Sequence, residues 1–333
     1  MMYGRIVGLY SSFIGLLLFT GIHGKPLLQT GNWDPLTISS PQETKLAEEY
    51  LKDCLEFRFD SGIYTVESTG TQISTCGLYL VGPLDTQVAI DFMDFNVGCE
   101  HKGLIGVLDG WEQEGYVFPP KHDVHGHHLR YETFCGIKQP KGTFLSSGNM
   151  ALIQYHLPTP GNGFVVRVQF VKNPQPCNMI SMFPGEPYIL RNYGQRVNCS
   201  MLTINPERIT LSLVNVGITP KISPAASSTN RLLPDRQAEA DFRSAQVCNP
   251  YEKGDYVEIK GGSNISVNNM ITFKQLCGAS AGEEETFGIF CGSTLVRLVS
   301  SGVYDNVVVI ETDSLDETEA DQPNSRNNVC RLI

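Results

Sequence analysis

Ten cysteines limit what this chain can fold into more than any other feature of its sequence. All ten follow residue 50, and the segment at the N-terminus predicts that they enter the oxidising secretory pathway. That segment has a charged start ending at Arg5, a short apolar run from Ile6 to Thr20, and small residues up to Gly24. It is typical of a cleaved secretory signal, predicted here as residues 1–24, and its apolar run is short for a membrane span. An even number of cysteines in a secreted chain predicts disulfide bonds.

Composition and motifs exclude several classes of function. The net charge of −10 argues against a nucleic-acid partner and is compatible with a basic peptide. No later segment is long and apolar enough to predict a membrane span. The sequence has no Cys-x-x-Cys, Gly-x-Ser-x-Gly, His-Glu-x-x-His or P-loop motif, so we predict neither an enzyme nor a cofactor.

The spacing of the cysteines predicts an internal duplication. An interval of 22 residues opens each half of the chain, a wider interval follows it, and a short strand ending in a glycine turn comes after the third cysteine of each half. The intervals are Cys54 to Cys76 with Cys99 to Cys135, and Cys177 to Cys199 with Cys248 to Cys277. We therefore expect an N-terminal extension at residues 25–44, a first domain at 45–173 and a second domain at 174–333.

Alternating hydrophobic residues predict β-strands through most of both domains. Residues 164–170 alternate apolar and polar side chains with a period of two, as a half-buried strand does. Two alternating segments meet out of phase at Phe92 and Met93, which predicts a one-residue β-bulge there. Helix is predicted only for residues 41–54, where good helix formers gather.

Two segments are expected to be loops, and two sites to carry glycans. Residues 219–246 are rich in proline and polar residues and read as a loop inserted into the second domain. Residues 311–328 are acidic with few apolar side chains, which predicts a solvated acidic loop. The sequons at Asn198 and Asn264 predict N-glycosylation.

Two clusters have competing interpretations. Residues 122–128 hold four of the seven histidines: His122, His125, His127 and His128. Imidazoles this close are compatible with zinc or copper, but a polar loop that titrates near pH 6.5 explains them as well, so we predict no metal site. Trp111, Tyr116 and Phe118 follow a turn; packing inside the fold is favoured over a role as exposed partner anchors.

Several segments resemble known proteins. Residues 107–110 and 254–259, each a strand-like run after a cysteine, resemble CUB domains. The resemblance narrows to the corticotropin-releasing factor-binding protein family through five segments that lie between Leu108 and Gly302. These segments are Leu-Asp-Gly-Trp at 108–111, Pro-Gly-Asn-Gly-Phe at 160–164, Pro-Cys-Asn-Met-Ile-Ser at 176–181, Arg-Val-Asn-Cys-Ser at 196–200 and Val-Arg-Leu-Val-Ser-Ser-Gly at 296–302.

This resemblance implies an all-β fold of two CUB-like jelly-roll β-sandwich domains stapled by five sequential disulfides. It also implies a secreted protein that sequesters peptide hormones of the corticotropin-releasing factor type and keeps them from receptors; in an invertebrate member the ligand would be a diuretic hormone of that type. The family's acidic ligand position falls on Glu56 and its basic position on Tyr50, with Lys52 and Arg58 able to supply the charge. The implied disulfides are Cys54–Cys76, Cys99–Cys135, Cys177–Cys199, Cys248–Cys277 and Cys291–Cys330.

Three further expectations complete the sequence-based picture. Calcium sites of the CUB type look incomplete, because Gly103 stands at a carboxylate position of the first domain and Gly261 replaces the turn aspartate of the second, although Asp255 is kept. The alternative functions are a CUB-type matrix or adhesion module and, less favoured, a histidine-metal hydrolase. The sequence makes no prediction of the oligomeric state.

Overall fold

The computed structural model describes residues 46–70, 74–124, 130–185, 187–205, 207–218, 246–247, 254–315 and 330. The predicted signal and N-terminal extension lie outside these residues. Within the described residues the secondary structure is β-strand, with two short 3-10 turns, η1 (Cys99–His101) and η2 (Lys121–Asp123). Across that same part of the chain, no helix has the length and apolar character to span a membrane.

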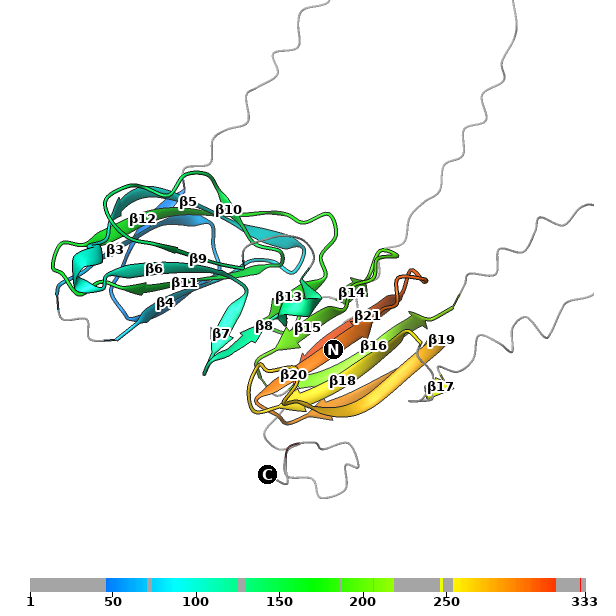
Figure 1. Cartoon of the computed structure of the whole chain (residues 1–333). Coiled ribbons are helices and arrows are strands. Elements are labelled where there is room, and N and C mark those ends of the chain that lie inside the picture. Colours follow the sequence, from blue (N-terminus) through cyan, green and yellow to red (C-terminus); the bar gives the residue numbers. More distant parts are fainter. Residues whose placement is uncertain are drawn as a thin grey trace, which may run out of the picture. The chain divides into compact units, whose positions relative to one another are not determined.

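The first half of the described chain is a sandwich of two five-stranded sheets, which Figure 1 shows as two layers. Sheet A has the order β1 (Ala47–Leu51), β3 (Gly62–Glu67), β12 (Gly163–Lys172), β5 (Thr86–Asn96) and β10 (Phe144–Leu145). Sheet B has the order β2 (Leu55–Arg58), β4 (Cys76–Val81), β11 (Met150–His156), β6 (Leu104–Asp109) and β9 (Tyr131–Phe134). A hairpin of β7 (Trp111–Gln113) and β8 (Tyr116–Phe118) follows β6.

Alternation along the strands builds the core of this sandwich. In β12, Phe164, Val166 and Val168 are buried while Arg167 is exposed, so one face of the strand enters the core and the other meets solvent. The predicted bulge is present, because Val165 pairs with Asp94 and Val166 with Phe92, which leaves Met93 without a partner in the ladder. The bulge returns Phe92 and Phe95 to the core on either side of it.

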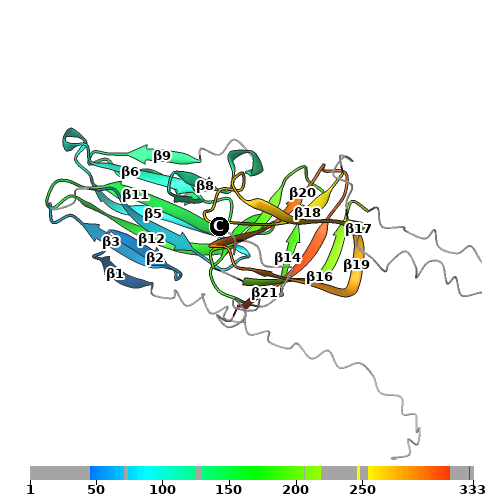
Figure 2. The same cartoon turned by 90° about the horizontal axis from the view of Figure 1, so that it is seen from below.

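The second half repeats this order in a single path of hydrogen-bonded strands. The long strand β19 pairs with β18 through its first part and with β16 through its second, so it joins what are two separate sheets in the first half. Figure 2 shows β19 bending where it passes from one set of strands to the other. The path is β13 (Asn178–Ser181), β15 (Cys199–Thr203), β20 (Ser293–Val299), β18 (Tyr256–Gly262), β19 (Ile271–Ile289), β16 (Glu207–Val216), β21 (Val307–Ser314) and β14 (Tyr188–Arg191), with β17 (Gln246–Val247) beside β19.

The two halves therefore have the same topology. The order β2-β4-β11-β6-β9 corresponds to β13-β15-β20-β18-β19, and β3-β12-β5-β10 corresponds to β14-β21-β16-β19. In both halves the first pair of the series, β2 with β4 and β13 with β15, is parallel. The all-β class with two sandwich-like halves is confirmed, and the change of half falls between Lys172 and Asn178.

Disulfides close corresponding places in the two halves. Four of the five expected bonds are present: Cys54–Cys76, Cys99–Cys135, Cys177–Cys199 and Cys291–Cys330. Cys277 is also disulfide-bonded, and its expected partner, Cys248, lies outside the described residues. Cys54–Cys76 links the start of edge strand β2 to β4, and Cys177–Cys199 links the start of edge strand β13 to β15. Each bond therefore keeps an edge strand paired with its sheet.

Two expectations from the sequence are wrong. Residues 47–51, predicted as part of a helix, form β1, because pairing in parallel with β3 satisfies the backbone and outweighs a modest helix propensity. The acidic segment that begins at Glu311 is not all loop, since β21 continues through Ser314 by pairing with β16. The remainder of the predicted acidic loop, 316–328, and residues 219–245 of the inserted loop lie outside the described residues, whereas Gln246 belongs to β17.

Besides the core inside each half, an apolar cluster contains side chains from both halves. Trp111 and Phe118 are buried, as expected, but their neighbours include Ile180, Leu202 and Leu295 rather than the interior of the first sandwich. Tyr116 of the same hairpin is exposed, so the expectation that it packs inside the fold is wrong. The hairpin β7–β8 therefore contributes apolar contacts with the second half.

Candidate peptide-binding site

The predicted ligand-contacting residues gather where two edge strands meet. β1 is the edge of sheet A, β2 is the edge of sheet B, and residues 52–54 join them. Each pairs in parallel with only one neighbour, so each leaves a backbone edge without a strand beside it among the described residues. The Cys54–Cys76 bond anchors the start of β2 to β4.

An ion network holds these two edges together. Arg58 donates from Nη2 and Nε to the two carboxylate oxygens of Glu49 at 2.7 and 3.0 Å, and from Nη1 to Oε2 of Glu56 at 2.9 Å. The other oxygen of Glu56 accepts the backbone N–H groups of Asp53, at 3.0 Å, and Lys52, at 3.3 Å. Fork-shaped contacts of this kind fix orientation as well as distance, so the connection between β1 and β2 has a defined shape.

The partners of Glu56 favour its ionised form. Burial acts to raise the pKa of Glu56, but the N–H of Asp53 and the guanidinium of Arg58 outweigh it and hold that pKa below its ordinary value. The Glu56 side chain is only 12% exposed, whereas Tyr50 is 70% exposed and Lys52 also faces solvent. The four predicted residues therefore lie on one connected segment. Glu56 and Arg58 bind other groups of this segment, whereas Tyr50 and Lys52 are exposed on its surface.

Sequence reasoning missed an apolar stripe on the same strand. Leu55 and Phe57 pair with Gly77 and Tyr79 of β4 and point away from the core, opposite to Glu56 and Arg58. Leu55 is 58% exposed, and Phe57 is exposed although its ring stacks on Tyr79 at 5.0 Å. Apolar and charged residues alternate from Leu55 to Phe59 in the sequence, which is the signal that predicts a strand here.

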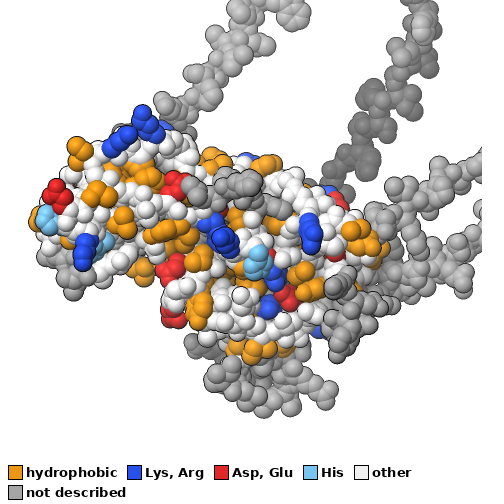
Figure 3. Space-filling model, viewed as in Figure 1, with side chains coloured by type: hydrophobic (Ala, Val, Ile, Leu, Met, Phe, Trp, Pro, Cys, Tyr) orange, Lys and Arg blue, Asp and Glu red, His pale blue; other side chains and the backbone are white. Residues whose placement is uncertain are grey.

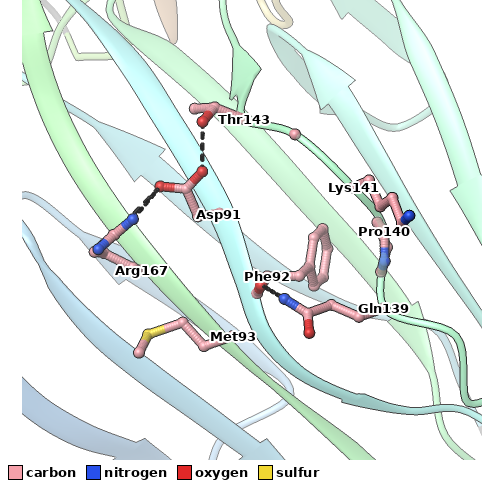
Figure 4. Close-up of a pocket in the computed structure, with 9 residues that line it drawn as sticks. Asp91, Phe92, Met93, Gln139, Pro140, Lys141, Thr143 and Arg167 are labelled. Atoms are coloured by element: carbon pink, nitrogen blue, oxygen red, sulfur yellow. Dashed lines mark hydrogen bonds and ion pairs between the residues drawn. The ribbon is translucent and has the colours of Figure 1, made fainter.

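A second candidate lies on the outer face of sheet A, at the bulge of β5. It is a hollow of about 600 Å³, and Figure 4 shows the side chains that surround it. Asp91 accepts from Thr143 and from Nη2 of Arg167 at 2.9 Å; these bonds lower the pKa of Asp91 despite its partial burial. Because Asp91 and Arg167 neutralise each other, the hollow offers a ligand chiefly the exposed Met93 and the cation of Lys141.

The histidine cluster is represented by one residue in the described part of the chain. His122 lies with Nε2 3.5 Å from Oδ1 of Asp123, while His125, His127 and His128 lie outside the described residues. In the described ranges no group of three or more metal-ligating side chains is found. Asp123 is instead bound by Arg297, whose Nη2 lies 2.9 and 3.1 Å from its two oxygens.

Other predicted sites have defined surroundings. Asp255, kept at a calcium-ligand position, accepts from the backbone of Ser301 at 2.8 Å and from Nδ2 of Asn306 at 2.7 Å, so its oxygens face hydrogen-bond donors. Nδ2 of Asn198, the atom that would bear a glycan, donates to Asp123 at 2.7 Å. Oδ1 of Asn264 accepts the Ser266 N–H at 3.0 Å in a local turn.

Comparison with known proteins gives a consistent result over nearly the whole chain. Residues 49–172 match the corticotropin-releasing factor binding protein N-terminal domain, and residues 179–321 match the corticotropin-releasing factor binding protein C-terminal domain. Corticotropin-releasing factor-binding protein of Homo sapiens is 27% identical over 325 residues, covering 94% of both chains. The protein of that name from Xenopus laevis is 28% identical over 287 residues, covering 83% of this chain and 81% of its own.

Among solved structures, the CUB1-EGF-CUB2 domain of human MASP-1/3 matches with a TM-score of 0.23 and 14% identity, covering 75% of this chain and 99% of that one. The assignment to a family rests on the sequence matches, because both domain models of one family follow each other in order across the two halves. The chain belongs to the corticotropin-releasing factor-binding protein family.

Proposed function

We propose that this chain is a secreted, non-catalytic binding protein that sequesters peptide hormones of the corticotropin-releasing factor type and so limits signalling by their receptors. The observation that carries the proposal is the match of both family domains to consecutive parts of the chain. The relatives are named for binding corticotropin-releasing factor. The disulfide-bonded described chain and the signal-like N-terminus support an extracellular location.

Sequestration suits the physical properties of both partners. A peptide hormone of this kind is amphipathic and orders as a helix when its apolar face is buried against a protein. A binding surface closed by disulfides loses little entropy on binding, which leaves more of the contact energy for affinity. We place the site at the β1–β2 edge, with Tyr50 and Lys52 on its surface and Glu56 and Arg58 fixing its shape.

Two finer features belong to the same proposal. If the chain comes from an invertebrate, its ligand is a diuretic hormone of the corticotropin-releasing factor type. N-glycans at Asn264 and Asn198 are compatible with secretion, but a glycan on Asn198 requires that its hydrogen bond to Asp123 be given up. The glycan at Asn264 is therefore the one we expect to be present on most molecules.

Isothermal titration calorimetry tests the proposed function directly. The full-length protein, secreted from cells so that its disulfides form, is titrated with synthetic peptides of the corticotropin-releasing factor and diuretic-hormone types. Saturable heat near one peptide per chain is expected, with a negative heat-capacity change from apolar burial. A scrambled peptide of the same composition is the control, because it keeps the charge and loses the amphipathic pattern.

Absence of saturable binding to every native peptide would refute the proposed function. Equal binding of native and scrambled peptides would refute recognition of an amphipathic helix and leave only nonspecific attraction. The same preparation supports the second readout, which is inhibition of receptor activation in cells by the added protein.

A further inference from the structure

The edge strand β2 of sheet B begins a row of exposed apolar side chains. Leu55 and Phe57 lie on its outer face, Phe59 follows two residues later, and the ring of Phe59 contacts that of Phe183 at 5.7 Å. All four are exposed, and Phe183 is 66% exposed. We call Leu55, Phe57, Phe59 and Phe183 the edge stripe. On the face seen in Figure 3, hydrophobic side chains lie singly or in small groups among polar ones. Contiguous exposed apolar side chains, such as those of the edge stripe, are typical of an interaction surface.

The edge stripe is backed by a rigid layer. Phe57 stacks on Tyr79, and both rings make edge contacts with the buried Trp111 at 5.9 and 5.1 Å. The hydroxyl of Tyr79 donates to the backbone oxygen of Glu112 at 2.9 Å, which fixes the ring. An apolar side chain held in this way loses little conformational entropy when a partner covers it, as is typical of residues that anchor an interface.

The surroundings of the edge stripe are acidic. Asp53 precedes Leu55 and Asp60 follows Phe59, and both are exposed. Glu114 is exposed on the β7–β8 turn, next to the segment that backs the stripe. Lys52, which precedes Asp53, is an exposed cation. These three carboxylates favour a partner that carries basic residues beside its apolar ones.

The spacing of the edge stripe fits a helix. Alternate residues of a strand are about 6.6 Å apart, since each residue advances the chain by roughly 3.3 Å. Residues four apart in a helix are about 6 Å apart along its axis. A helix lying along β2 therefore places three successive apolar residues, at i, i+4 and i+8, over Leu55, Phe57 and Phe59.

We propose that the edge stripe is the docking surface for the apolar face of an amphipathic peptide helix with basic residues on its flanks. This inference rests on the proposed function and names the surface that performs it. Glu56 and Arg58 lie on the opposite face of β2, so the stripe, rather than these charges, supplies the apolar contact area. Tyr50 and Lys52 lie at one end of the stripe, within reach of a flanking segment of the peptide.

The test is binding of a synthetic corticotropin-releasing factor-type peptide to full-length variants by calorimetry. Leu55→Ser and Phe183→Ser remove exposed side chains, so each is expected to weaken binding by about fivefold, and the pair by about 25-fold, without unfolding the protein. Val303→Ser is the matched control, because Val303 is 75% exposed and belongs to the second half. It is expected to leave the dissociation constant unchanged, and thermal unfolding checks that all variants remain folded.

A variant with a reversed surface charge tests the same docking surface independently. Asp60→Lys reverses one carboxylate at the end of the stripe and is expected to weaken binding by about threefold at low salt, with little difference at about 0.5 M salt, where surface charges are screened. The inference is overturned if the wild-type protein binds the peptide and the Leu55→Ser/Phe183→Ser variant binds it within twofold. It is also overturned if that variant instead dissociates a wild-type dimer, which would assign the stripe to a second copy of the chain. If the wild-type protein binds no native peptide, the proposed function itself fails.

Discussion

A buried ion network centred on Arg297 gives the sharpest test of how the described fold is held together. Arg297 is 12% exposed, Asp123 has no exposed side-chain surface and Glu258 has almost none. Two nitrogens of the guanidinium serve the two acids: Nη2 contacts both oxygens of Asp123, and Nη1 lies 3.2 Å from Oε1 of Glu258. Arg297 therefore pairs with two buried carboxylates from distant parts of the sequence, and Nζ of Lys260 lies 3.9 Å from Oε1 of Glu258 as a more distant second cation.

Replacing Arg297 by methionine keeps the apolar stem but leaves both carboxylates without their main cation. Breaking a buried ion pair from one side typically costs about 3–5 kcal/mol, because the remaining charge stays desolvated. We expect Arg297→Met to fall in that range. Asp123→Asn should cost less, about 1–3 kcal/mol, because Arg297 keeps Glu258 as its partner. The pair of the exposed Arg167 and the partly buried Asp91 is the control, and Arg167→Met should cost less than about 1 kcal/mol because solvent screens the guanidinium.

The assay is unfolding in urea of the protein with its disulfides intact, monitored by tryptophan fluorescence. If uncompensated carboxylates are the cause, adding Asp123→Asn to Arg297→Met must recover part of the loss, so the double variant should be more stable than Arg297→Met alone by about 1 kcal/mol or more. Additive losses in the double variant, or a loss below about 1 kcal/mol for Arg297→Met, would show that desolvated carboxylates are not what destabilises the variant.

Three further predictions concern stability. Burial raises the pKa of Glu207 to about 7, so the folded state binds a proton more tightly than the unfolded chain, and the stability contributed by the protonated side chain is present at low pH and lost as pH rises through 7. The free energy of unfolding of Glu207→Gln should match that of the wild type near pH 4 and exceed it by about 3 kcal/mol at pH 8. Equal free energies of unfolding for the two proteins from pH 4 to 8 would contradict this. Replacing Cys54 and Cys76 by serine opens a 22-residue separation and should cost about 3 kcal/mol in urea unfolding, where an unchanged midpoint would show that the bond does not stabilise the fold. Gly148→Ala would place a Cβ 2.1 Å from the backbone oxygen of Asn178, so we expect a loss of about 1–3 kcal/mol, and a melting temperature equal to wild type would show that this close approach is not required.

Much of the fold was predictable because its signals are local or covalent. The duplicated spacing of cysteines anticipated two halves with the same strand order, and the phase change at Phe92 and Met93 anticipated the bulge. The error at residues 47–51 has a different origin. Helix propensity is a weak preference, and pairing in parallel with β3, where Ala47 lies opposite Gly62, decided that β1 is a strand.

The candidate site was predictable only in part for a related reason. Resemblance to a family pointed to Glu56 and Arg58, but whether a side chain faces the core edge or solvent depends on strand register, and β2 pairs with a strand 22 residues away. Register places Glu56 opposite Leu78 and Phe57 opposite Tyr79, so alternate residues take different roles. The contact between Phe59 and Phe183 brings together residues that no local pattern connects.

Hydrogen–deuterium exchange on the full-length protein, with and without saturating hormone-type peptide, tests most directly where the ligand is held. We expect slower exchange in peptide fragments that span residues 47–59 when the hormone is bound, and unchanged exchange around Val303. Saturating binding with no added protection at residues 47–59, or with protection confined to the hollow beside Met93, would show that the hormone is not held at the β1–β2 edge.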